Sequence, residues 1–199
     1  KSEVIKDYFK KKFRKNILLN NKNETFIKKN NFSIRIVNTG KNSLTGGRIK
    51  RIRKYVEKDA FFHMTYGDGL SNVNINKLTK FHLKNKKFAT VTTVKIQVPQ
   101  ERFGVVYFKN KNTVKEFVEK PDIKEIFING GFFVLNSKIF KFIKDDFTRW
   151  EAKPLERIAK QKQLAAFKHT GFWKCMDTIR DRKYLEQFKN KKFPWNTLN

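Results

Sequence analysis

Two short acidic motifs, far apart in the chain, carry the residues best suited to chemistry. Residues 65–69 read Thr-Tyr-Gly-Asp-Gly, and residues 171–178 read Gly-Phe-Trp-Lys-Cys-Met-Asp-Thr. Each motif follows an apolar run typical of a β-strand and places one carboxylate, Asp68 or Asp177, where that strand should end. Loops at the carboxyl ends of strands bind ligands in open α/β sheets. Because Mg²⁺ commonly takes one or two carboxylates and completes its shell with phosphate and water oxygens, the pattern predicts one metal–phosphate site built from both motifs.

Three further motifs have both a functional and an ordinary structural interpretation. Residues 43–48 (Ser-Leu-Thr-Gly-Gly-Arg) lead into a helix whose N–H groups could face an anion or a base edge, or form a plain loop with Thr45 as cap. Residues 119–121 (Glu-Lys-Pro) could bind sugar hydroxyls and a phosphate, or form a surface ion pair. Residues 129–131 (Asn-Gly-Gly), inside an apolar strand, indicate close approach of a ligand or of another backbone, or else a β-bulge. The Asp-Gly pair at residues 68–69 taken alone is typical of a turn.

The elements that must position these motifs follow from hydrophobic periodicity. Apolar and alternating runs predict strands at 32–37, 60–66, 87–96, 103–108, 113–118, 126–135 and 164–169, of which the fourth and fifth form a hairpin. Helical spacing predicts helices at 2–13, after Thr45, and at 74–85, 136–145, 151–163 and 178–189, the last with Thr178 and Asp181 at capping-box spacing. Residues 15–31 are polar, and we expect an exposed excursion there. Strand–helix alternation with one antiparallel insertion predicts an α/β fold with a mixed sheet.

Composition restricts the function classes. The 199 residues carry a formal net charge of +28, with the lysines spread along the whole chain. This charge allows a nucleic-acid-binding protein, but the sequence contains no helix-turn-helix or basic-aromatic RNA motif, so we interpret it as a lysine-rich surface that draws anionic substrates. One cysteine excludes an internal disulfide and fits a reducing cytoplasm. There is no signal peptide and no apolar run near the roughly 18 residues of a membrane span.

Taken in order, the motifs form a more specific series. It reads N-T-G-K-N-S-L-T-G-G-R-I-K-R (38–51), T-Y-G-D-G (65–69), R-F-G-V-V (102–106), F-V-E-K-P (117–121), I-N-G-G-F-F-V-L-N (128–136), W-E-A-K-P-L (150–155), G-F-W-K-C-M-D-T (171–178) and P-W-N-T (194–197). The series, which covers nearly the whole chain, resembles the sugar-1-phosphate nucleotidyltransferases, and within them the cytidylyltransferase branch.

The resemblance implies a Rossmann-like nucleotide-diphospho-sugar transferase fold with a mixed, mainly parallel sheet. It implies that residues 1–199 are one nucleotidyltransferase domain whose activity is to make CDP-glucose and diphosphate from CTP and α-D-glucose 1-phosphate. It further implies a cytoplasmic homo-oligomer that serves surface-polysaccharide synthesis, with neither a membrane nor a specific nucleic acid as partner.

Site residues follow from the same resemblance, position by position. Asp68 and Asp177 would be catalytic and would hold Mg²⁺. The nucleotide would contact Ser43, Arg48 and Gly67. The sugar-phosphate pocket would be lined by Gly104, Glu119, Lys120 and Asn129.

One departure from the family pattern changes the expectation for these residues. The family's L-A-G-G-x-G-T-R loop and the P-K-P segment, which hold the triphosphate and supply a catalytic Arg and Lys, do not occur in the 199 residues. We therefore expect a fold that is incomplete at the N-terminal side, lacking the first strand and the phosphate loop. We also expect no activity from the 199 residues alone. A non-catalytic or truncated sugar-nucleotide-binding remnant is the alternative.

Overall fold

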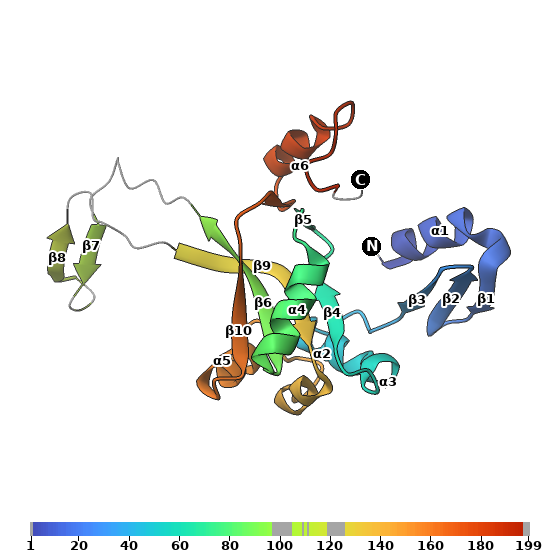
Figure 1. Cartoon of the computed structure of the whole chain (residues 1–199), viewed down its shortest axis with the longest axis horizontal. Helices are drawn as coiled ribbons and strands as arrows, with labels where there is room; N and C mark the ends of the chain where they lie inside the picture. The colour runs from blue at the N-terminus through green and yellow to red at the C-terminus, as the bar shows by residue number, and fades with distance from the viewer. Residues whose placement is uncertain (1, 97–104, 109, 111, 119–125, 197–199) are drawn as a thin grey trace. The chain divides into compact units, whose positions relative to one another are not determined.

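The computed structural model describes residues 2–96, 105–108, 110, 112–118 and 126–196 (Figure 1). The chain divides into two compact units, Lys1–Ala60 with Ser137–Ile158 and Phe61–Asn136 with Ala159–Asn199. Each unit therefore draws on two stretches of the chain. No helix among the described residues has the length and apolar character needed to cross a membrane.

The second unit contains the main sheet. Its elements are β4 (Phe62–Thr65), β5 (Gly69–Ser71), α4 (Ile75–Asn85), β6 (Ala89–Ile96), β7 (Val105–Phe108), β8 (Val114–Val118), β9 (Ile126–Leu135), β10 (Leu164–His169), β11 (Trp173–Cys175) and α6 (Ile179–Glu186). The sheet order is β10-β6-β9-β4. β4, β6 and β10 run in one direction and β9 runs against them, so the predicted α/β fold with a mixed sheet is confirmed.

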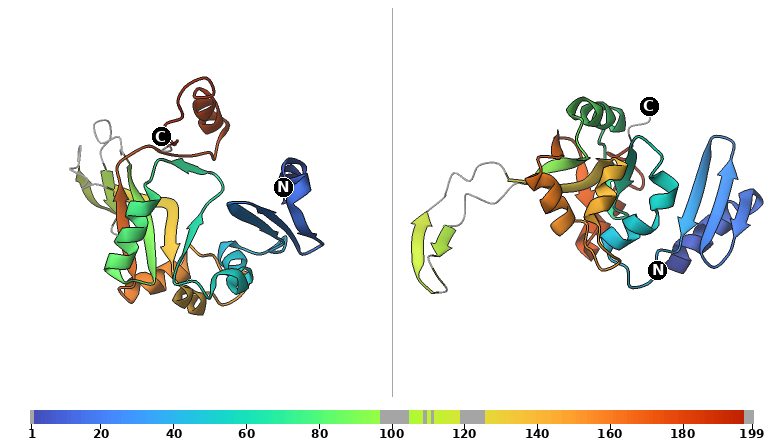
Figure 2. Two further views of the ribbon diagram at one scale, coloured as in Figure 1. Left: turned by 45° about the vertical axis from the view of Figure 1, so that its right-hand side comes forward. Right: turned by 90° about the horizontal axis from the view of Figure 1, so that it is seen from below.

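Helix α4 packs against one face of this sheet (Figures 1 and 2). Its apolar side contributes Leu78, which is fully buried together with Val134 and Leu135 of β9. Apolar residues at helical spacing on α4 meet the almost continuous apolar run of β9, and their burial is the main favourable term in the stability of the unit. Asn74 caps the helix by accepting a hydrogen bond from the Lys77 N–H at 2.8 Å.

Two short pairings complete this unit. β5 pairs with β11 in antiparallel fashion, and β7 pairs with β8, which confirms the predicted hairpin. The β5–β11 pair joins parts of the chain about a hundred residues apart and was not predicted, because three-residue strands leave no periodicity in the sequence.

The first unit holds α1 (Ser2–Lys12), η1 (Arg14–Asn16), β1 (Ile17–Asn20), β2 (Glu24–Lys29), β3 (Phe32–Val37), α2 (Thr45–Arg51), α3 (Arg53–Val56), η2 (Ser137–Phe142) and the start of α5 (Lys153–Lys160). β1, β2 and β3 form an antiparallel three-stranded sheet. Residues 15–31 are mostly exposed, as expected, but they also form β1 and β2, two strands that the sequence analysis did not predict. The Asn21 side chain accepts hydrogen bonds from the N–H groups of Asn23 and Glu24, both at 2.9 Å, and this Asx-turn closes the first hairpin.

Candidate active site

The two acidic motifs come together in the second unit. In the β5–β11 pair, Gly69 lies opposite Cys175, and just beyond it the Met176 N–H donates to the Asp68 carbonyl oxygen at 2.9 Å. Asp177 is the next residue after Met176. The backbone therefore places the Asp68 and Asp177 segments side by side, and both Asp side chains are exposed.

The donor set of these segments fits a metal of the Mg²⁺ type. Within the part of the chain that the structure describes, no group of three or more His, Cys, Asp or Glu side chains could form an all-protein metal cage. Two exposed carboxylates on adjoining segments are what Mg²⁺ commonly takes from a protein, since phosphate and water oxygens supply its other ligands. Asp68 and Asp177 are the residues that would hold the ion.

The Asp177 segment is fixed by its neighbour α6. Thr178 caps α6 by accepting from the Asp181 N–H at 3.2 Å, and the Asp181 carboxylate accepts from the Thr178 N–H at 2.9 Å, which confirms the predicted capping box. Lys174 of β11 reaches the same carboxylate at 2.6 Å. The hydrogen bonds from Lys174 and Thr178 hold the pKa of Asp181 well below its usual range. Residues on both sides of Asp177 are thus tied to one carboxylate.

Asn129 lies in an irregular part of β9. Along β6, Val91 lies opposite Phe133 while Thr93 lies opposite Asn129, so β9 contains two more residues than β6 between these pairs. Gly130 and Gly131 occupy this bulge. The β-bulge interpretation and the close approach of another backbone both hold, because a Cβ on Gly130 would lie 3.0 Å from the Thr92 carbonyl oxygen.

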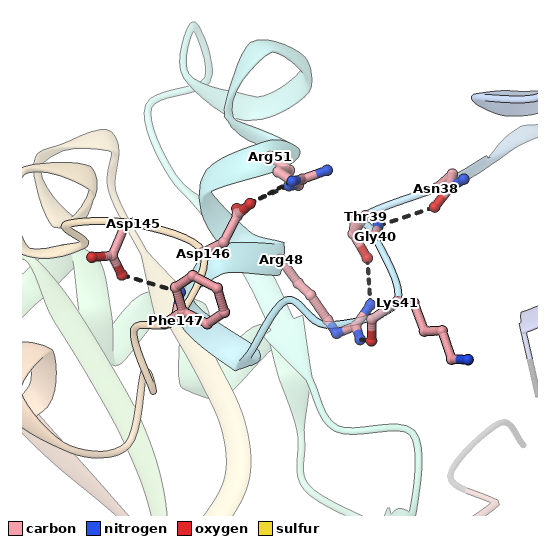
Figure 3. A network of polar contacts seen from close by, with 9 residues as sticks. All are labelled: Asn38, Thr39, Gly40, Lys41, Arg48, Arg51, Asp145, Asp146 and Phe147. Atoms are coloured by element: carbon pink, nitrogen blue, oxygen red, sulfur yellow. Dashed lines mark hydrogen bonds and ion pairs between the residues drawn. The ribbon is translucent and has the colours of Figure 1, made fainter.

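Ser43 and Arg48 both belong to the first unit. Ser43 lies in the loop before α2, whereas Arg48 is part of α2 and its side chain reaches back to that loop (Figure 3). The exposed Arg48 guanidinium donates to the Thr39 hydroxyl at 2.7 Å and to the Lys41 carbonyl oxygen at 3.3 Å, which steadies the loop before α2. Ser43 is buried in this loop. Gly67 lies in the second unit, and a Cβ placed on it would meet nothing within 4 Å, so packing does not require glycine there.

Helix α2 packs unusually closely on residues 145–148. A Cβ on Gly47 would lie 2.5 Å from Asp146 Cα, and one on Gly46 would lie 2.7 Å from the Thr148 carbonyl oxygen. The Leu44 N–H donates to the Asp146 carbonyl oxygen at 2.8 Å. The Gly46–Gly47 pair therefore allows α2 to pack closely on the loop of residues 145–148.

Thr45 does not cap α2, contrary to the sequence expectation. Leu44 is the N-cap residue and Thr45 begins the helix. The Thr45 hydroxyl accepts from the Trp150 N–H at 2.9 Å and donates to the Glu151 carboxylate at 2.6 Å. The Thr45 hydroxyl therefore bonds to residues about a hundred positions away and not to its own helix. The local sequence around Thr45 does not indicate these distant partners.

Three of the predicted sugar-phosphate residues, Gly104, Glu119 and Lys120, lie outside the described residues. Two residues that sequence reasoning missed are Tyr66 and Asp146. Tyr66 belongs to the T-Y-G-D-G motif, two residues before Asp68, and this position is the signal in the sequence that could have identified it. Asp146 had no such signal, because its contacts to α2 are all tertiary.

Comparison with known proteins supports the fold and identifies the family. The nucleotidyl transferase family matches residues 4–185, and the chain belongs to this family.

Within this family, the chain is similar to named glucose-1-phosphate cytidylyltransferases. The chain is 41% identical over 209 residues to glucose-1-phosphate cytidylyltransferase of Salmonella typhimurium, covering 99% of this chain and 78% of that protein. It is 37% identical over 161 residues to a probable glucose-1-phosphate cytidylyltransferase of Bacillus subtilis, covering 80% of this chain and 61% of that protein. The crystal structure of HddC from Yersinia pseudotuberculosis superposes with a TM-score of 0.53 at 23% identity, over 75% of this chain and 64% of that one, and supports the fold.

Proposed function

We propose that this chain contributes the metal-binding and sugar-phosphate-binding residues of a glucose-1-phosphate cytidylyltransferase, which forms CDP-glucose and diphosphate from CTP and α-D-glucose 1-phosphate. The observation that carries the proposal is the β5–β11 pairing, which brings the segments of Asp68 and Asp177 together through the 2.9 Å hydrogen bond from Met176. The name and 41% identity of the Salmonella relative support the choice of nucleotide and sugar.

In the proposed reaction, a phosphate oxygen of glucose 1-phosphate attacks the α-phosphorus of CTP in line. The new P–O bond forms as the bond to diphosphate breaks, so the protein's task is to position the reactants and neutralise charge. When bound, Mg²⁺ supplies charge neutralisation on the phosphate oxygens. Asp68 and Asp177 would hold the metal. By the family resemblance, Ser43, Arg48 and Gly67 would contact the nucleotide, and Gly104, Glu119, Lys120 and Asn129 would bind the sugar phosphate.

The proposal extends to the setting of the enzyme. We infer Mg²⁺ as the metal in use, a cytoplasmic homo-oligomer, and a role in making CDP-linked sugars for surface polysaccharide. The family membership supports a divalent metal ion, and the single cysteine fits a reducing compartment; the oligomeric state and the pathway follow from the family resemblance alone.

Diphosphate release by the protein purified from its own cells tests the reaction. CTP, glucose 1-phosphate and Mg²⁺ together should give CDP-glucose and diphosphate. Replacing CTP by GTP, or glucose 1-phosphate by mannose 1-phosphate, should release little diphosphate. Asp68→Asn and Asp177→Asn should each remove turnover, while Asp59→Asn, at an exposed position in the other unit, should not. Equal turnover with every nucleotide, or full activity in both site variants, would overturn the proposal.

A further inference from the structure

The Gly130–Gly131 bulge of β9 is held between the two segments that carry Asp68 and Asp177. Tyr66, two residues before Asp68, contacts the Asn129 side chain and Gly131. Trp173, four residues before Asp177, contacts the other glycine. All of these residues belong to the second compact unit.

The Tyr66 ring occupies the space that a side chain on Gly131 would need. Gly131 has a left-handed backbone with φ of +77°, and a Cβ on it would lie 2.8 Å from Tyr66 Cδ2. The Tyr66 N–H also donates to the Gly131 carbonyl oxygen at 3.3 Å. Only glycine combines this backbone conformation with such close ring contact, so the bulge and the tyrosine fit each other.

The orientation of the Asn129 amide is fixed by two different partners. Its Oδ1 accepts from the Gly131 N–H at 2.8 Å, and a backbone N–H can only donate. The Nδ2 group must therefore point the other way, where it donates to the Tyr66 hydroxyl at 3.3 Å. An exposed amide that would otherwise rotate is thereby held in one orientation.

The opposite contact comes from the Asp177 segment. The Trp173 indole N–H donates to the Gly130 carbonyl oxygen at 2.7 Å, and Trp173 itself pairs with Ser71 in the β5–β11 ladder. The half-buried Trp173 indole therefore connects the β5–β11 pair, which adjoins Asp68 and Asp177, to β9, which contains Asn129.

We infer that Tyr66 and Trp173 are positioning residues that fix Asn129 and its strand relative to the Asp68 and Asp177 segments, so that sugar-phosphate binding depends on the Tyr66 hydroxyl and the Trp173 indole N–H. The inference rests on the proposed function, because it takes Asn129 as a sugar-phosphate ligand. Glucose 1-phosphate gains from this arrangement because the amide that meets it is already oriented when it binds.

The test measures α-D-glucose 1-phosphate binding by titration calorimetry in the presence of Mg²⁺. Tyr66→Phe keeps the ring in the Gly131 space and removes only the hydroxyl, and Trp173→Phe removes the indole N–H. Each should weaken binding about two- to tenfold, the effect of one lost hydrogen bond. Tyr8→Phe is the matched control, because it removes an exposed tyrosine hydroxyl that accepts from Lys12 in the other unit, and it should leave binding unchanged.

A double-mutant cycle separates positioning from a general loss of structure. If Tyr66 acts through Asn129, Tyr66→Phe should have no further effect on binding in an Asn129→Ala background. In the single Tyr66→Phe variant, the KM for glucose 1-phosphate should rise while the KM for CTP stays unchanged. Additive effects of the two changes, or unchanged binding in Tyr66→Phe, would overturn the inference alone. If Asn129→Ala itself binds glucose 1-phosphate normally, the sugar-phosphate assignment fails and the inference falls with it.

Discussion

Gly47→Ala is the substitution whose outcome the structure predicts most sharply in the first unit. Two effects oppose each other. Alanine is favoured over glycine in a helix by about 1 kcal/mol. The new Cβ, however, would lie 2.5 Å from Asp146 Cα and 2.7 Å from its carbonyl carbon. These are backbone atoms that no rotamer change can move, so the 145–148 loop itself must shift.

The clash should outweigh the propensity gain. Overpacking of this kind costs typically about 1–3 kcal/mol, and here it also strains two tertiary contacts of Asp146. One is the 2.8 Å hydrogen bond from the Leu44 N–H, and the other is the ion pair with Arg51, whose Nε donates to Asp146 at 2.9 Å (Figure 3). We expect a net loss of about 1–2 kcal/mol, which corresponds to a fall in Tm of about 2–8 °C for a chain of this length.

Thermal unfolding followed by circular dichroism is the assay, with Gly67→Ala as the matched control. A Cβ on Gly67 meets nothing within 4 Å, so this second variant should unfold at the wild-type temperature or slightly above it. A Gly47→Ala protein as stable as the wild type would refute the close helix–loop packing and, with it, our explanation of the Gly46–Gly47 pair.

Two further predictions concern protonation and metal affinity. Burial, and secondarily the nearby His63, lowers the pKa of His82, so below the ordinary histidine pKa of 6.5 the unfolded chain binds more protons than the folded one. Stability should therefore fall as pH drops from 7 to 5, and urea unfolding of His82→Gln should show a smaller fall over that range; an equal fall would remove His82 as its cause. Asp181→Asn should loosen the Asp177 segment and weaken Mg²⁺ binding about tenfold or more, as loss of a residue that orients a metal ligand does, whereas Asp59→Asn should leave the calorimetric affinity unchanged.

Local signals in the sequence predicted much of the fold. The β9 strand begins and ends as expected at Ile126 and Leu135, because ten mostly apolar residues between polar ones leave little ambiguity. The capping box at Thr178 was likewise confirmed, since both partners lie within four residues. The helix expected at 136–145 is instead the 3-10 helix Ser137–Phe142, a difference of hydrogen-bond pattern that hydrophobic spacing alone does not resolve.

Tertiary contacts explain what was missed at the site. The acidic motifs were evident from their types and placement, but the β5–β11 pairing that joins them is formed by residues a hundred positions apart. The Tyr66 contact with Asn129 joins residues 63 positions apart, and the contact of Asp146 with Arg51 of α2 joins residues 95 positions apart. Within residues 15–31, the two buried residues, Thr25 and Ile27, are outnumbered by lysines and asparagines, so the composition gave no sign of the two strands.

Asp68 and Asp177 are proposed to hold one metal ion against a sugar nucleotide. The most direct measurement is the broadening of the ³¹P NMR signals of CDP-glucose by Mn²⁺ bound to the protein. We predict that Asp68→Asn, Asp177→Asn and the double variant all lose the protein-dependent broadening to the same extent, with Asp59→Asn behaving as the wild type. If each single variant instead kept about half of the broadening and only the double variant lost it, the two residues would hold separate ions and the shared site would be contradicted.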